Sequence, residues 1–171
     1  MGQTVAAVRY VVPQGETWPD GHRDDRVHEV DMAVELVVIS GSTVVLSWAM
    51  DGLAEGMAIG LRDPGELEGS PAGAAVDVTA HTDWRRFLGK PISDVAAAWH
   101  VPNEGCGEMP WAFRVDLSGE TGFVVALGES TATDLTYVPD AILVIFEKRL
   151  AEAYRIPAGA TSSYGSNEYR G

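Results

Sequence analysis

Runs of β-branched and other apolar residues, separated by polar segments that contain Gly or Pro, mark the first third of the chain and are typical of strands. Residues 4–12 are rich in β-branched side chains and end at Pro13, so they predict a first or edge strand. Residues 33–39 and 43–50 flank a short Gly-containing turn and predict a β-hairpin. Residues 57–61 can return as a third strand, which would complete a three-stranded meander.

A similar pattern recurs in the second half. Residues 111–117 place large apolar side chains at every second position, and a Ser-Gly-Glu turn leads into an apolar run over 122–127. A third run covers 141–146. This meander could be an internal duplication of 33–61 in 111–146, or the two hairpins could have converged on the same turn chemistry, and both interpretations stay open.

Helical patterns are short and few. Asp83 is placed to cap a short helix over 84–88, and residues 147–154 form a second run of helix formers. Residues 92–101 fit a helix or a strand, but the Gly-Lys-Pro before them and Pro102 after them favour a strand. Residues 76–79 are expected to form another short strand.

The remaining segments are rich in Gly, Pro and charged residues. Residues 14–31 and 63–74 are expected to be loops, and 158–171 a flexible C-terminal tail. Residues 1–157 then form one globular domain. The predicted fold class is α+β and β-rich: two antiparallel meanders that form a sandwich or a partly open barrel, with one or two short helices.

The composition is acidic, with a formal net charge of −13, and the acids are spread along the chain: 14 precede position 86 and 11 follow it. Such a surface repels nucleic acid and anionic lipid and attracts a basic protein partner. No apolar run is long enough to span a membrane, and the N-terminus carries no export or lipid-anchor signal. With Cys106 as its single cysteine, the chain is expected to be cytoplasmic.

Possible metal ligands are densest in the loop over 14–31. Imidazole and carboxylate groups together suit zinc or manganese. The alternative is a solvated acidic loop in which Arg23 and Arg26 pair with the carboxylates. The residues concerned are His22, Asp24, Asp25, His28, Glu29 and Asp31.

Few residues predict catalysis. Cys106 lies between two glycines, and the neighbouring Glu104 and Glu108 would raise its thiol pKa, which favours an ordinary loop thiol over a nucleophile. Glu55 and Glu129 follow the two hairpins at similar places and could act as an acid–base pair if they shared a cleft. The chain has no Walker A, GxGxxG, GxSxG, HExxH or CxxC motif. We therefore assign no catalytic residue and expect no cofactor.

A series of short features spans residues 33 to 154, and it resembles uncharacterised small acidic proteins of high-GC bacteria. Those proteins in turn resemble the immunity proteins of bacterial toxin systems, which are often small, acidic, β-rich and catalytically silent. The resemblance implies a protein-binding role and assigns no functional position. Its features are Trp48, Glu55-Gly56, Trp84, Leu88-Gly89, Ile92, Val95, Trp99, Leu127-Gly128-Glu129, Tyr137-Val138-Pro139-Asp140 and Val144-Ile145-Phe146.

Our leading hypothesis is a non-enzymatic, acidic protein-binding module, in particular an immunity-type inhibitor of a basic partner. An exposed Trp18 would anchor the interface among the acids Asp20, Asp24, Asp25, Glu29 and Asp31. One alternative is a small-molecule-binding protein or hydrolase with a cavity between the two meanders, which uses His22 and His28, or Glu55 and Glu129. A further alternative is a structural subunit whose C-terminal tail docks into a larger assembly.

Overall fold

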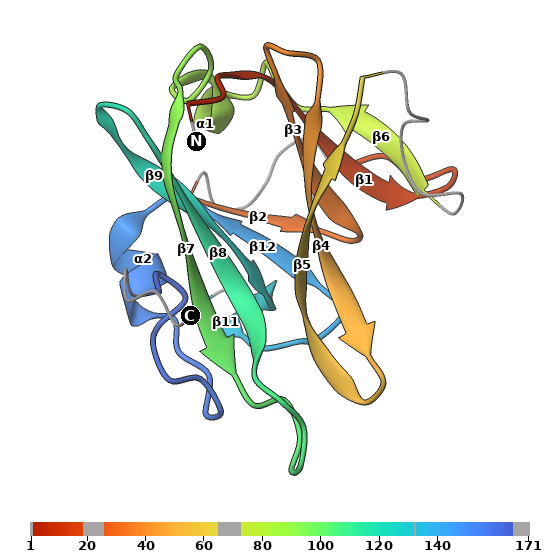
Figure 1. Ribbon diagram of the computed structural model, residues 1–171, viewed down its shortest axis with the longest axis vertical. Helices are drawn as coiled ribbons and strands as arrows, with labels where there is room; N and C mark the ends of the chain where they lie inside the picture. The colour runs from red at the N-terminus through yellow and green to blue at the C-terminus, as the bar shows by residue number, and fades with distance from the viewer. Residues whose placement is uncertain (1, 19–25, 65–72, 132, 166–171) are drawn as a thin grey trace.

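The computed structural model describes residues 2–18, 26–64, 73–131 and 133–165. Within these ranges the chain forms a β-rich α+β fold, in which two five-stranded antiparallel sheets face each other and do not close into a barrel (Figure 1). A separate pair of two-residue strands, β10 (Glu129–Ser130) and β11 (Leu135–Thr136), lies outside the two large sheets. The sandwich-like arrangement confirms the predicted fold class.

The first sheet has the strand order β5-β4-β3-β1-β6. It contains the predicted hairpin and its third strand, and β5 is longer than the sequence pattern indicated. Alternating apolar residues and glycine-containing turns explain why this meander forms locally. The strands are β1 (Val5–Pro13), β3 (Ala33–Val38), β4 (Thr43–Asp51), β5 (Ala54–Arg62) and β6 (Gly73–Asp77).

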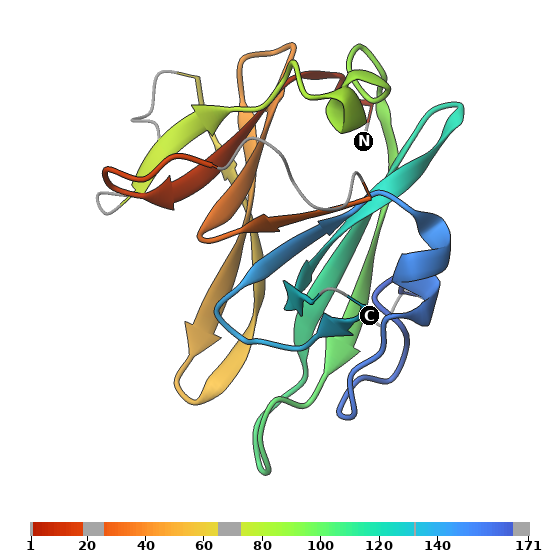
Figure 2. The same ribbon diagram turned by 180° about the vertical axis from the view of Figure 1, so that it is seen from behind.

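The second sheet has the strand order β2-β12-β9-β8-β7. The ambiguous segment 92–101 is a strand, as favoured, and it pairs antiparallel with β8. Figure 2 shows from behind how this sheet faces the first one. The strands of the meander over 33–61 thus lie in the first sheet, and β8, β9 and β12 of the meander over 111–146 lie in the second. That one meander is a duplicate of the other stays a prediction. The strands are β2 (Val27–Val30), β7 (Ile92–His100), β8 (Met109–Leu117), β9 (Glu120–Leu127) and β12 (Ile142–Ile145).

Two strands extend into segments where the sequence predicted loop. β2 lies inside the expected loop 14–31. β6 begins at Gly73, inside the expected loop 63–74, and overlaps the strand expected over 76–79 only at residues 76–77. Both are short and have little periodicity of their own, because they form by pairing with β12 and β1, which are distant in sequence. Tertiary pairing has overridden weak local propensity at both places.

Both predicted helices are present. α1 (Thr82–Arg85) begins earlier than expected, and its N-cap is His81, whose side chain accepts from the backbone amide of Asp83. Asp83 therefore lies in the first turn instead of capping the helix. α2 (Lys148–Ala153) lies on the second sheet, on the side away from the first sheet (Figures 1 and 2). Among the described residues no helix is long and apolar enough to cross a membrane.

The C-terminal segment was expected to leave the domain as a flexible tail, but residues 158–165 pack against it. Ser163 is fully buried, and its hydroxyl donates to the Ala151 carbonyl over 2.8 Å. The Tyr164 ring lies 4.4 Å from the Arg114 guanidinium, which also donates to the Tyr164 carbonyl. Small residues allow this close packing, although their composition suggested disorder. The remaining residues of the predicted tail lie outside the described ranges.

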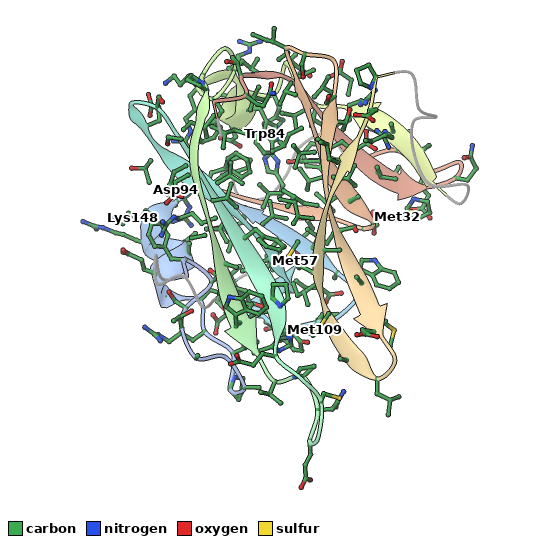
Figure 3. The ribbon with its side chains drawn as sticks, in the orientation of Figure 1. Met32, Met57, Trp84, Asp94, Met109 and Lys148 are labelled. Carbon is green, nitrogen blue, oxygen red and sulfur yellow. The ribbon has the colours of Figure 1, made fainter. Side chains whose placement is uncertain are left out.

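The two sheets approach each other closely at Gly56. A Cβ atom there would lie 2.8 Å from the Met109 Cβ and 2.9 Å from the Pro110 carbonyl oxygen, so β5 and β8 pass each other where only glycine fits. The neighbouring Met57 is buried near the centre of the molecule, between the sheets (Figure 3). This contact fixes the position of the β4–β5 hairpin relative to the second sheet.

Candidate functional site

A chain of hydrogen bonds crosses the interior between the sheets. Tyr10 of β1 lies with its hydroxyl 2.6 Å from His28 Nδ1 of β2, and His28 Nε2 lies 3.0 Å from Asp83 Oδ2 of α1. The Trp84 indole N–H donates to the Tyr10 hydroxyl over 2.8 Å. His28 has no exposed surface. His28 therefore links Tyr10 through one ring nitrogen and Asp83 through the other. The three residues come from three separate segments of the chain.

The direction of each hydrogen bond follows from what each group can do. The indole N–H can only donate, so the Tyr10 oxygen accepts from Trp84. The Asp83 carboxylate only accepts, so a neutral His28 carries its hydrogen on Nε2, and Nδ1 accepts the hydrogen of the Tyr10 hydroxyl. Nδ1 is then the unprotonated nitrogen of His28. Its Nε2 carries the hydrogen and donates to the Asp83 carboxylate. Burial raises the pKa of Tyr10 well above its usual value, so the phenol keeps the hydrogen that this chain requires.

The side chains of His81 and Trp18 pack around His28. The His81 ring lies 4.5 Å from the His28 ring between centroids, and its Nδ1 lies 3.5 Å from Asp83 Oδ2. Trp18 packs against the rings of Tyr10, His28 and His81, and its indole N–H donates to the Glu29 carbonyl over 2.8 Å. We call His28, His81 and Asp83 the histidine cluster; the donor atoms of its members lie within 4.8 Å of one another.

Of the six residues predicted as an acidic binding surface, the structure describes Trp18, Glu29 and Asp31. Trp18 was expected to be an exposed anchor, but only 6% of its surface is exposed, because its ring covers the histidine cluster. The Glu29 carboxylate accepts from the amide and the hydroxyl of Ser130, so it holds β10 against β2. Asp31 is exposed in the turn between β2 and β3. The other predicted residues, Asp20, His22, Asp24 and Asp25, lie outside the described ranges.

Exposed apolar side chains gather instead on the β4–β5 hairpin. Trp48 lies opposite Met57 and Leu46 opposite Ile59, so these residues share one face of the hairpin. Leu46 and Met57 are buried, and the same face then continues beyond the part that the second sheet covers. Met50 is 57% exposed and Leu61 is 70% exposed. We call the exposed set the hairpin strip; it consists of Trp48, Met50, Leu53, Ile59 and Leu61.

The surroundings of the hairpin strip are acidic. The β4–β5 turn, 51–54, and the β7–β8 loop, 101–108, lie at the same end of the molecule (Figures 1 and 2), and the Asn103 amide donates to the Leu53 carbonyl over 2.7 Å. Asp51, Glu104 and Glu108 are exposed there. Neither 27–61 nor 91–113 contains a lysine or arginine.

A cleft of about 520 Å³ lies between β2, the β10–β11 pair and α2. Its size suits a small ligand. Several of its polar groups already have partners, however: Arg26 pairs with Glu147 at 2.9 Å, and the Tyr154 hydroxyl donates to the Leu127 carbonyl. The cleft is also not between the two meanders, where the sequence hypothesis expected a cavity.

The sequence signals for these sites were partial. The hairpin strip follows from the predicted hairpin, but its exposure depends on how far the second sheet reaches. The histidine cluster had one local signal, the pair His81 and Asp83 two positions apart at the start of a predicted helix. His28 was a candidate ligand, although its partners are distant residues and not its own loop. Comparison of the chain with protein-family models, with curated proteins and with solved structures gave no match.

Proposed function

We propose that the protein is a non-enzymatic, acidic protein-binding module, of the type of an immunity inhibitor, and that it binds a basic partner through the hairpin strip. The observation that carries this proposal is the position of Trp48, Met50 and Leu61: apolar side chains exposed together on an edge hairpin. Exposed apolar clusters with a polar rim are typical of interaction sites, and Trp is enriched among residues that dominate binding energy. This surface replaces the one centred on Trp18.

Charge indicates the kind of partner. Asp51, Glu104 and Glu108 rim the strip, and the nearest arginine in sequence, Arg62, is 2.8 Å from the buried carboxylate of Glu35. A partner with lysines and arginines around an apolar centre would gain both packing and long-range attraction. The attraction should speed association and weaken as salt rises.

The test compares three variants in pull-down experiments. The tagged full chain is incubated with lysate of its source organism at low salt and at high salt, and bound proteins are identified by mass spectrometry. Leu61→Lys and Met50→Lys put a partner-like charge on the strip. Ile39→Lys is the matched control, because Ile39 is 71% exposed but lies outside the strip. The proposal expects one basic protein that the wild type and Ile39→Lys retain and the two strip variants lose by at least about tenfold.

Other outcomes contradict the proposal. A partner that all four chains retain equally would bind elsewhere. A strip variant that changes the oligomeric state of the purified protein, measured by sedimentation, would make the strip a contact between copies of this chain. The alternative, a small-molecule-binding protein or hydrolase, would gain support if a ligand filling the cleft raised the melting temperature. The structural-subunit alternative would need the C-terminal segment to be available for docking, and residues 158–165 are packed.

A further inference from the structure

We propose that the histidine cluster, His28, His81 and Asp83, is a binding site for a divalent transition-metal ion such as Zn²⁺. Two imidazoles and a carboxylate form the donor set that Zn²⁺ and its neighbours Co²⁺ and Ni²⁺ favour, whereas Mg²⁺ and Ca²⁺ prefer oxygen donors throughout. The three residues come from β2 and from the start of α1, so the fold brings them together and no single loop does. This site is independent of the hairpin strip.

The distances fit coordination by one ion. Zinc–nitrogen and zinc–oxygen bonds are about 2.0–2.2 Å, so two ligands of a tetrahedral ion lie roughly 3.3–3.5 Å apart. His28 Nε2 lies 3.0 Å from Asp83 Oδ2, and His81 Nδ1 lies 3.5 Å from the same oxygen. Both pairs of donor atoms that include Asp83 therefore stand near the separation that a bound ion imposes, and the two imidazole nitrogens lie within 4.8 Å of each other. Closing the site would take small adjustments of side-chain torsions, and the ion would replace the 3.4 Å hydrogen bond that His81 Nδ1 accepts from the Asp83 amide.

Metal binding would replace the hydrogen bond between His28 and Asp83. The single ring hydrogen of His28 would move from Nε2 to Nδ1, so the ring would stay neutral and the lone pair of Nε2 would bind the ion. The hydroxyl hydrogen of Tyr10, which points to Nδ1 without the ion, would turn away from the ring. The Tyr10 oxygen, 2.6 Å from Nδ1, would then accept from His28 instead of donating to it. Through this hydrogen bond Tyr10 would fix the orientation of the His28 ring, as the outer hydrogen-bond partners of many metal ligands do.

The surroundings favour a bound ion. Trp18 and Phe146 pack against the His28 ring, with centroid separations of 4.9 Å and 4.7 Å. These apolar rings limit access of water, so the carboxylate charge of Asp83 acts in a medium of low dielectric constant. Three protein ligands leave one tetrahedral position open, and water or a further donor group can occupy it.

The experiment titrates the untagged full chain, freed of metal with a chelator, with Co²⁺ and with Zn²⁺. Co²⁺ bound by nitrogen and oxygen ligands in a four- or five-coordinate site absorbs visible light more strongly than hexaaquo Co²⁺. We expect one equivalent of Co²⁺ to develop this absorption and one equivalent of Zn²⁺ to remove it. Calorimetry should give the same stoichiometry, and nitrogen chemical shifts of His28 should move from the Nε2–H to the Nδ1–H form.

The variants assign the ion to these residues. Asp83→Asn and His81→Gln should each weaken Zn²⁺ binding by more than about 100-fold, the upper end of what loss of an outer hydrogen-bond partner costs. His81→Gln keeps the hydrogen bond between His28 and Asp83, so it tests the site even if Asp83→Asn fails to fold. His100→Gln is the matched control, because His100 is buried and its Nε2 lies 2.9 Å from the Glu55 carbonyl oxygen.

His100→Gln should bind Zn²⁺ as the wild type does. Absence of the visible Co²⁺ absorption in the wild type would overturn the proposal. So would equal affinity in the wild type and His81→Gln, or loss of binding in His100→Gln alone. Failure of any of these tests would leave the hairpin strip untouched, since its variants are scored by partner capture.

Discussion

The Tyr10 hydroxyl lies 2.6 Å from His28 Nδ1 and connects the two sheets through a hydrogen bond inside the core. Tyr10 belongs to β1 of the first sheet, and His28 to β2 of the second. Both groups are buried, so neither can turn to water if its partner is lost. The pair therefore contributes to how the two sheets are held in register as well as to the histidine cluster.

Tyr10→Phe should destabilise the protein by about 1–3 kcal/mol, because it leaves the Trp84 indole N–H and His28 Nδ1 buried without their partner. Urea unfolding followed by tryptophan fluorescence measures the loss. Tyr164→Phe is the control, since Tyr164 is only half-buried, and it should change stability by less than about 0.5 kcal/mol. Equal losses of stability in the two variants would mean that the buried Tyr10 hydroxyl stabilises the protein no more than the half-buried Tyr164 hydroxyl does.

The hairpins could be predicted from the sequence because their information is local. Alternating apolar residues around Gly41 and Gly119 specify strand, turn and face within about ten residues, and both glycines have the positive φ that such turns need. For β7 the apolar pattern fitted a helix as well, and the flanking Gly-Lys-Pro and Pro102 favoured the strand that the structure has. In these segments the pattern, the turn chemistry and the tertiary structure all agree.

The histidine cluster and the position of Trp18 could not be predicted in this way, because their information is non-local. Fifty-five positions separate His28 from Asp83. Charged and polar neighbours made Trp18 look exposed, yet its ring packs on Tyr10, which is eight positions away on another element. The composition of a segment indicates whether most of its residues are exposed. It does not predict the burial of a single side chain that points from a loop into the core.

A chain that ends at Pro157 should lose about 2–4 kcal/mol of stability. It lacks the two hydrogen bonds of Ser163, to the carbonyls of Ala151 and Tyr154, and the contact between Tyr164 and Arg114. The single variant Ser163→Ala should lose about 1 kcal/mol, which separates the buried hydroxyl from the rest. Thermal unfolding compares the three chains. A truncated chain as stable as the wild type would favour a docking role for this segment over a structural one.

Mild acid should weaken the protein through His100. Burial lowers the pKa of His100 below its usual value, although the Glu55 carbonyl partly opposes this shift. Below a pH of about 6.5 the unfolded chain gains a proton at this position more readily than the folded chain does. Stability should therefore fall as the pH drops through this value, by up to about 1.4 kcal/mol per pH unit until His100 titrates in the folded state.

The variant His100→Gln isolates that contribution, because glutamine can still donate to the Glu55 carbonyl but does not titrate. Urea unfolding at pH values of about 7.5 and 5.5 should show a smaller loss in the variant than in the wild type. All other titratable groups are the same in both chains, so the difference between the two losses belongs to His100. Equal losses would contradict the assignment.

Gly56→Ala should destabilise the protein by about 1–3 kcal/mol and also weaken partner binding. The added methyl group would meet the Met109 Cβ and the Pro110 carbonyl oxygen at less than van der Waals distance, and the backbone oxygen cannot move aside by a rotamer change. β5 would have to shift away from β8, and Ile59 and Leu61 of the hairpin strip would move with it.

Gly60→Ala is the matched control on the same strand, since a Cβ atom there has no neighbour within 4 Å. It should leave stability unchanged or raise it by a few tenths of a kcal/mol, because alanine restricts the unfolded chain. If Gly56→Ala behaved like Gly60→Ala in urea unfolding, β5 and β8 would not be in close contact in solution. The hydrogen bond from Asn103 to Leu53 would then be a second link between the hairpin and the second sheet, and its loss should loosen the end of the hairpin that carries Leu53.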